Sequence, residues 1–358
     1  MDLQITWFVL LCVLWSAYFV TEGFDFGVGM LLPILGRDEA DRQAMFASIG
    51  PVWDGIEVWL IIAGAATFAA FPVWYATMFS GFYVALLLLL VLLIVRIVSF
   101  EWRSKRESPT WRGFWTWVNT VSSLGIPLVW GIGLTSLLYG TPIAANGQFT
   151  GSFWSLFTWY TVFAGIALAL LCALHGAVYL SVRTSPGDLR ERASGLAAWL
   201  AVPAAVLGAV FLVWTLIVGM DRNHQGLWPG ILVIVLGAIA VVAAIVLTRL
   251  GRPALAFVAS ATTIVLAVVM LFVELYPRVM VSSTTFANSL TVENSSSAHY
   301  TLTVMTVTAA LLLPVVLLYQ AWTYHVFRAR LGGSPPARNP AELLGGRPTP
   351  DSAGDDRG

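Results

Sequence analysis

The chain has 358 residues, of which 58% are hydrophobic and only 11% are charged, and its formal net charge at pH 7 is zero. A soluble globular chain carries about 25% charged residues and about 45–50% apolar ones, so this composition excludes a soluble enzyme and a disordered regulator. No basic run is present, which excludes a nucleic-acid binder. The sequence therefore predicts an all-α, polytopic transmembrane helical bundle.

The first apolar run is expected to be a retained membrane span. A signal peptide needs a basic region at its start, whereas the first basic residue of this chain is Arg37. A membrane-crossing helix needs about 20 largely apolar residues, and nine segments of the sequence meet this requirement. The nine expected spans are residues 5–33, 50–71, 76–100, 114–139, 154–181, 196–219, 228–248, 254–276 and 300–327.

The distribution of Lys and Arg sets the expected orientation of these spans. With nine spans, 16 of the 19 basic residues fall on one side of the membrane and two fall on the other. Basic residues concentrate on the cytoplasmic side, so we expect the N-terminus outside and the C-terminus in the cytoplasm. The transmembrane domain is expected over residues 1–330, followed by a disordered, Pro- and Gly-rich cytoplasmic tail over 331–358.

Ionisable residues inside the expected spans are the candidate functional groups. Glu22 and Asp25 lie in the first span, and Asp54 and Glu57 lie in the second. The spacing i, i+3 places the two acids of each pair on one helix face. Arg96, in the third span, supplies a single cation at a similar depth. Because intramembrane ionisable residues usually mark ion or proton paths, the group is expected to form a proton path in the inner half of the membrane.

Each of these acids also has a structural interpretation. Arg96 can neutralise one carboxylate in a fixed ion pair, and an acid can cap a helix end near Pro51. His175, in the fifth span, is a further candidate for the same region of the membrane. Glu274 is expected at the outer interface, with Arg278 at i+4 as its partner.

Ligands for haem or metal are scarce. Membrane-bound b-type haem needs axial His or Met, and no two of the four histidines are expected to face each other at one depth. Cys12 and Cys172 lie singly in apolar runs, which argues against a disulfide or a thiolate metal site. We therefore expect this chain to hold no redox metal, no haem and no catalytic residue of its own.

Several strings resemble the signatures of subunit II of cytochrome bd-type quinol oxidases. Two of them carry the acids, namely EGFDFGVG at 22–29 and SIGPVWDGIEVWL at 48–60. The matches follow one another along nearly the whole chain. The remaining strings are FSGFY at 79–83, FEWRSK at 100–105, NSLTVENSSS at 288–297 and YQAWTYHVFR at 319–328.

This resemblance implies two four-helix bundles plus one peripheral helix, in a heterodimer with a haem-bearing subunit I. Subunit I would hold two b-type haems and one d-type haem. The complex would oxidise quinol and reduce O2 to water in the respiratory chain of a bacterial cytoplasmic membrane, electrogenically but without pumping protons. The resemblance also allows a structural quinone or lipid and a small single-span accessory subunit.

Carried over from the family, the proton-path residues would be Asp25 and Asp54, with Glu22, Glu57 and Arg96 beside them. Two departures are visible. Ile56 stands where the family usually has Asn, and 97–99 reads Ile-Val-Ser where the family usually has Pro-Val-Gly. The first departure removes a polar residue from the path, and the second predicts a straighter helix end. The alternatives are a proton-coupled secondary transporter and a purely structural scaffold subunit without an ion path.

Overall fold

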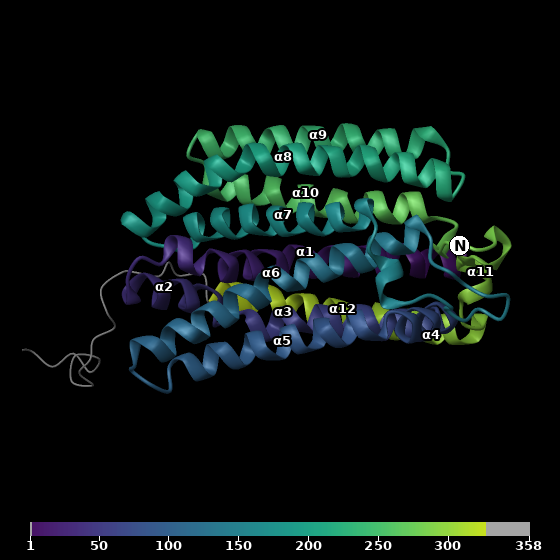
Figure 1. The fold of residues 1–358 in the computed structure, drawn as a ribbon, viewed down its shortest axis with the longest axis horizontal. Helices are drawn as coiled ribbons and strands as arrows, with labels where there is room; N and C mark the ends of the chain where they lie inside the picture. The colour runs from purple at the N-terminus through teal and green to yellow at the C-terminus, as the bar shows by residue number, and fades with distance from the viewer. Residues whose placement is uncertain (1, 327–358) are drawn as a thin grey trace, which may run out of the picture.

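The computed structural model describes residues 2–326 and is dominated by long helices (Figure 1). Within this part of the chain, nine helices are long and apolar enough to cross a membrane, which confirms the predicted all-α, nine-span architecture. The expected tail over 331–358 lies outside the described residues. The nine helices are α1 (Leu3–Leu35), α3 (Trp53–Ala70), α5 (Tyr83–Arg103), α6 (Pro109–Tyr139), α7 (Trp159–Arg183), α8 (Asp188–Arg222), α9 (Leu227–Arg249), α10 (Pro253–Leu275) and α12 (His299–Val326).

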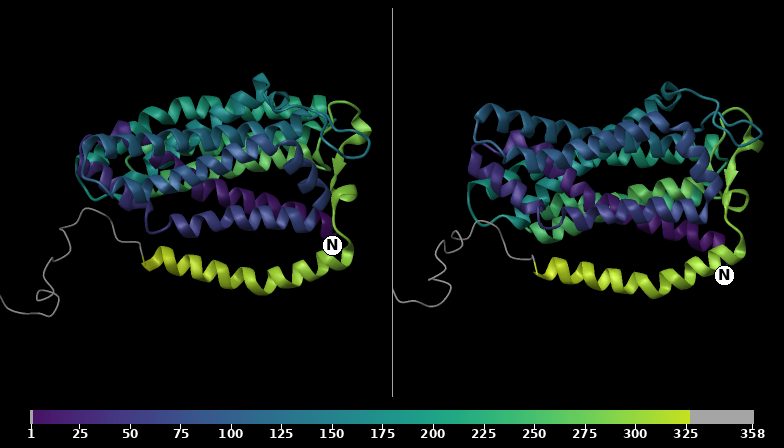
Figure 2. Two further views of the ribbon diagram at one scale, coloured as in Figure 1. Left: turned by 60° about the horizontal axis from the view of Figure 1, so that its bottom comes forward. Right: turned by 90° about the horizontal axis from the view of Figure 1, so that it is seen from below.

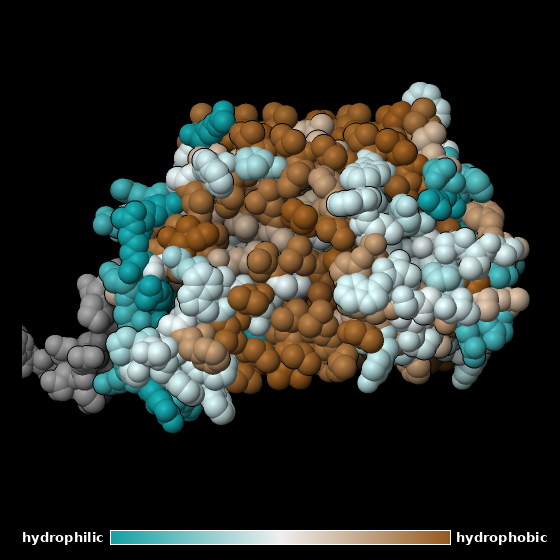
Figure 3. Space-filling view, in the orientation of Figure 1, coloured by the Kyte–Doolittle hydropathy of each residue, from teal (hydrophilic) through white to brown (hydrophobic). Residues whose placement is uncertain are grey.

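The long helices form two groups of four and one peripheral helix. In one group, α1 packs against α3 and α6, and α6 packs against α5. In the other, α7, α8, α9 and α10 pack against one another, and α7 also contacts α1 and α6. Helix α12 lies at the margin against α1 and α3 (Figure 2). Apolar side chains form a belt between two more hydrophilic ends (Figure 3), as expected for a body that spans a bilayer.

The two groups meet where α1 crosses α7 at a pair of glycines. A Cβ atom added to Gly27 would collide with the carbonyl oxygen of Cys172 and lie 2.7 Å from the Cα atom of Gly176. Small residues let helix backbones approach closely in membranes. This contact fixes the face that α1 turns toward α7, and with it the face that carries Asp25.

Two helices divide the chain more finely than the sequence predicts. Helix α2 (Glu39–Ile49) lies in the first connection, where Asp38 caps it by accepting a hydrogen bond from the Asp41 amide at 2.8 Å. Helix α4 (Pro72–Gly81) occupies the start of the expected third span, and the helical conformation is interrupted at Phe82 before α5 begins. Proline at the first helical position is compatible with helix initiation, so α4 begins directly after α3.

The end of the molecule opposite α2 is capped by short elements from the connections after α6 and α10. The strands β1 (Arg278–Met280) and β2 (Leu290–Thr291) pair antiparallel. The long connection that the sequence places before the last span is therefore packed and ordered. The other short elements are η1 (Phe153–Leu156), η2 (Phe286–Asn288) and α11 (Val292–Ser295).

Candidate functional site

A buried ion pair between α1 and α5 forms the centre of the candidate site. Nη2 of Arg96 lies 2.6 Å from Oδ1 of Asp25, and each side chain is 1% exposed. The guanidinium also lies over the rings of Phe26 and Phe100, at 5.1 and 5.4 Å from their centroids. Aromatic faces attract cations, so the arginine is held by one carboxylate and two rings.

Helix α6 supplies a polar face to this pair, and the sequence analysis missed it. Nε of Arg96 donates to Oγ of Ser123 at 3.1 Å, and Nδ2 of Asn119 donates to Oγ of Ser99 at 2.9 Å. The hydroxyl of Thr120 donates to the Gly29 carbonyl at 3.1 Å. The spacing of Asn119 and Ser123 at i, i+4 in an otherwise apolar span was a usable signal.

Two further carboxyl groups lie close to the pair. Glu22 is buried on α1, and neither of its oxygens has a hydrogen-bond partner in the described part of the chain. Glu57 on α3 is half-buried, and its Oε1 is likewise buried and unpartnered there. Both acids interact electrostatically with Arg96 and Asp25. Three carboxyl groups thus lie around one guanidinium, and uncompensated charge in the membrane is costly.

The structure places Asp54 outside the buried cluster. Asp54 lies in the first turn of α3 and its side chain is exposed, while it still interacts electrostatically with Glu57 one turn further on. Ile56, between them in the sequence, is buried. The two acids of α3 therefore connect a surface position with the interior, but Asp54 does not itself contact the ion pair.

His175 occupies a separate, fully satisfied position on α7. Its Nδ1 lies 2.7 Å from Oγ of Ser260, and its Nε2 lies 3.2 Å from the Val20 carbonyl oxygen. The imidazole stacks on Phe257 with ring centroids 4.4 Å apart. Within the described residues, no hydrogen bond or ion pair joins it to the four acids, and its contacts are with α1 and α10.

The expected pairing of Glu274 with Arg278 is wrong: no ion pair joins them among the described residues, although Glu274 lies in the last turn of α10. Glu274 is fully buried, and the Cβ position of Gly219 or Gly230 would collide with its carboxyl group. Arg278 instead donates to Oδ1 of Asn223 at 3.0 Å, while Nδ2 of Asn223 donates to the Glu274 carbonyl at 2.7 Å. The two glycines make room for this acid among α8, α9 and α10.

A second ionic contact lies where α2 covers the end of α5. The guanidinium of Arg103 donates to both oxygens of Glu39, at 3.0 and 2.7 Å, and Arg112 lies 3.5 Å from the same carboxylate. Partial burial alone would raise the pKa of Glu39, but the hydrogen bonds and charge of Arg103, with Arg112, outweigh it and hold that pKa below its ordinary value. This contact fixes α2 over the end of the bundle nearest the acid cluster.

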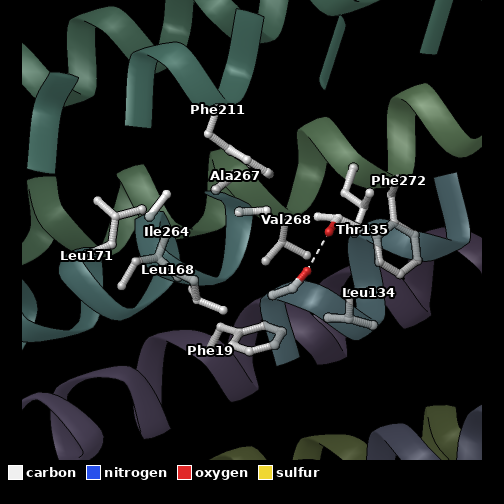
Figure 4. Close-up of a pocket in the computed structure, with 14 residues that line it drawn as sticks. Phe19, Leu134, Thr135, Leu168, Leu171, Phe211, Ile264, Ala267, Val268 and Phe272 are labelled. Atoms are coloured by element: carbon white, nitrogen blue, oxygen red, sulfur yellow. Dashed lines mark hydrogen bonds between the residues drawn. The ribbon is translucent and has the colours of Figure 1, made fainter. Parts of the chain in front are cut away.

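The cavity drawn in Figure 4 lies among α1, α6, α7, α8 and α10 and has a volume of about 50 Å³. Phe19, Phe211 and Val268 are typical of its lining. The hydroxyl of Thr135 donates to the Gly131 carbonyl of its own helix at 2.5 Å, so its hydrogen is not available to a ligand in the cavity. The cavity is apolar and does not extend the acid cluster.

The chain is similar to known proteins in both sequence and fold. The family model described as cytochrome bd terminal oxidase subunit II matches residues 3–327. The chain is 38% identical over 335 residues to cytochrome bd ubiquinol oxidase subunit 2 of Bacillus subtilis, covering 92% of this chain and 97% of that protein. It is 36% identical over 373 residues to cytochrome bd-I ubiquinol oxidase subunit 2 of Escherichia coli K12, covering 95% and 98%. A chain of the bd oxidase structure from Geobacillus thermodenitrificans shares the fold, with a TM-score of 0.72 at 19% identity, covering 92% of this chain and 100% of that one.

Proposed function

The chain belongs to the cytochrome bd terminal oxidase subunit II family, and we propose from this that its partner, subunit I, carries two b-type haems and one d-type haem. The chain is the non-haem subunit of a quinol oxidase, a multi-pass protein of the bacterial cytoplasmic membrane. Family membership favours this function over a secondary transporter.

The side chains of this subunit support the proposal that the haems lie in subunit I. An axial haem ligand needs a free imidazole nitrogen or a thioether, and both nitrogens of the buried His175 have partners within the chain. His224 and His299 are exposed. Haem supplies the electron transfer and O2 chemistry of the complex, and this chain contributes the protein surroundings.

We further propose that the acid cluster delivers protons for O2 reduction. The observation that carries this proposal is the graded burial of the carboxyl groups, from exposed Asp54 through half-buried Glu57 to buried Glu22 and the buried Asp25–Arg96 pair. Carboxyl groups thus lie at successive depths between the surface and the buried ion pair. The basic residues concentrated at this end of the helices support an entrance on the cytoplasmic side.

A scaffold role without a proton path is the second candidate. It is favoured by buried, apolar Ile56 between Asp54 and Glu57, and by the tight ion pair that occupies Asp25. Under this alternative the cluster only fixes the packing of α1, α5 and α6.

The variant Asp54→Asn in the complete complex separates the two candidates. If Asp54 takes up protons, quinol-dependent O2 consumption and membrane-potential generation fall several-fold while the haem spectrum per complex stays normal. Asp221→Asn is the matched control. Asp221 is also an exposed carboxylate, but it lies at the C-terminal end of α8, away from the acid cluster, and is paired with Arg222 at 3.0 Å. Normal turnover in Asp54→Asn, or an equal loss of haem and activity, would reject the proton path.

The remaining components of the complex follow from family membership alone. We propose a quinol and O2 as its substrates, with a structural quinone or lipid and a small single-span accessory subunit as further constituents. Mass spectrometry of the purified complex identifies a bound quinone, a lipid or an accessory subunit, and O2 consumption with added quinol tests the substrates.

A further inference from the structure

A second cavity, with both polar and apolar lining residues, lies in the α7–α10 group, away from the acid cluster. Its volume is about 170 Å³, roughly ten times the ~10–15 Å³ that one water molecule requires. It lies where α7 ends, α8 begins and the chain turns from α9 into α10. Its lining residues are Val178, Ser181, Arg190, Ser194, Thr248, Gly251, Pro253 and Ala256.

Two donors on α8 have no partner among the residues that the structure describes. Arg190 is half-buried, and no carboxylate of the described chain lies within ion-pair distance of it. Its neighbour Arg192 differs, because Nη2 of Arg192 lies 2.5 Å from Oδ2 of Asp41. Ser194, one turn from Arg190, makes no hydrogen bond to any other described residue. The guanidinium of Arg190 is therefore the uncompensated charge of the cavity.

The surroundings of the cavity favour an anion. Arg249 ends α9 and Arg252 precedes α10, so two further, exposed arginines lie in the turn that contributes Thr248, Gly251 and Pro253 to the lining. The first turn of α10 lines the cavity at Pro253 and Ala256, and a helix N-terminus carries partial positive charge. Asp188 and Glu191, the acids in the first turn of α8, are both exposed.

We propose that this cavity binds a phosphate group, supplied either by an anionic phospholipid of the adjacent leaflet or by free phosphate. Arginine is suited to phosphate oxygens because its planar guanidinium donates in parallel pairs. The cavity lies at the ends of membrane-spanning helices, and basic pockets between such helices bind lipid head groups. Arg190 and Ser194 supply the hydrogen bonds, and the apolar surface of the bundle next to the cavity accommodates acyl chains.

Native mass spectrometry of the purified two-subunit complex, titrated with dioleoylphosphatidylglycerol, tests this proposal. We expect Arg190→Gln to weaken the tightest lipid-binding event about tenfold or more, and Arg190→Lys to weaken it less. Lys105→Gln is the matched control, because it removes one positive charge at the same end of the molecule, in the turn after α5. An unchanged haem spectrum shows that each variant is folded and assembled.

Inorganic phosphate distinguishes the two sources. If millimolar phosphate displaces the lipid from the wild-type complex but has no effect on the residual lipid binding of Arg190→Gln, the site takes free phosphate as well. If phosphate fails to compete while the lipid depends on Arg190, the phospholipid is the ligand. Equal lipid affinity in wild type and Arg190→Gln, or equal losses in Arg190→Gln and Lys105→Gln, would overturn the proposal.

Discussion

Arg96 on α5 and Asp25 on α1 are joined by a 2.6 Å ion pair in which both side chains are almost completely buried. Helix α6 packs against both of these helices and adds the hydroxyl of Ser123 as a further acceptor for Arg96. The pair thus links three helices of one bundle through a single guanidinium. Among the described residues, this is the only ion pair that Arg96 or Asp25 forms.

Removing one member of this pair is expected to be more harmful than removing both. Arg96→Leu leaves a buried carboxylate without its cation, at a cost of about 3–5 kcal/mol, whereas the double variant Asp25→Leu, Arg96→Leu removes both charges. We expect the single variant to lose haem-containing complex at a lower temperature than the double variant. The measurement is the temperature at which half of the assembled complex is lost. Equal loss in both variants would show that the ion pair does not stabilise this bundle.

Ile56→Asn tests whether the buried apolar residue limits proton delivery. An amide beside Asp54 and Glu57 adds a hydrogen-bonding group inside α3, so proton uptake is expected to become a few-fold faster, at about 1–3 kcal/mol of stability for the buried polar group. The readout is proton-uptake kinetics during O2 reduction. Val58→Asn, at an exposed position of the same helix, controls for the added amide. Unchanged kinetics with Ile56→Asn would favour the scaffold function.

Gly27→Val should prevent α1 from packing on α7. The added side chain would enter the space occupied by the backbones of Cys172 and Gly176, and overpacking against backbone cannot be relieved by a rotamer change. We expect little or no assembled complex in membranes, measured by haem content and by subunit II on a blot. Gly64→Val is the control, because nothing lies within 4 Å of a Cβ at Gly64. Normal assembly of Gly27→Val would contradict the close helix crossing.

The contact between Glu39 and Arg103 predicts a pH-dependent contribution to stability. Because the folded protein holds the pKa of Glu39 below its ordinary value, ionised Glu39 stabilises the fold at neutral pH, and this contribution is lost as the pH falls through the lowered pKa. Glu39→Gln should therefore melt earlier than wild type at pH 7, with a difference of at most about 1 kcal/mol, and the two melting curves should converge in acid. A pH-independent difference would point to packing of α2 instead.

Glu274→Leu is expected to stabilise the bundle of α7 to α10. Glu274 buries a carboxyl group whose oxygens have no hydrogen-bond partner among the described residues, and replacing such a group with an apolar one of similar size gains about 1–3 kcal/mol. Thermal unfolding of the complex checks the sign. A lower melting temperature in Glu274→Leu would reveal a polar contact for this carboxyl group in the assembled enzyme.

The sequence was sufficient for the number of spans and for bringing Glu22, Asp25, Glu57 and Arg96 together, because apolar length and rare intramembrane charge are local properties. It did not reveal how far each helix is rotated about its axis. That rotation exposes Asp54 while burying Ile56 and Glu274, and it depends on contacts such as Gly27 with Gly176 between distant segments. Helix α2 was missed because its composition is that of a polar loop, and its position depends on Arg103, 64 residues from Glu39.

Helix α12 is attached to the rest of the chain mainly near its first turns. Ser297 donates to the carbonyl oxygens of Ala69 and Ala70 at 2.6 and 2.8 Å, and the Trp7 indole donates to Thr306 at 3.0 Å. From Leu311 to Tyr319 the large apolar side chains are mostly exposed. A helix held mainly by contacts near one end can tilt at small energetic cost. Its final inclination is therefore decided by whatever lies along its free length, and the lone subunit leaves that angle unspecified.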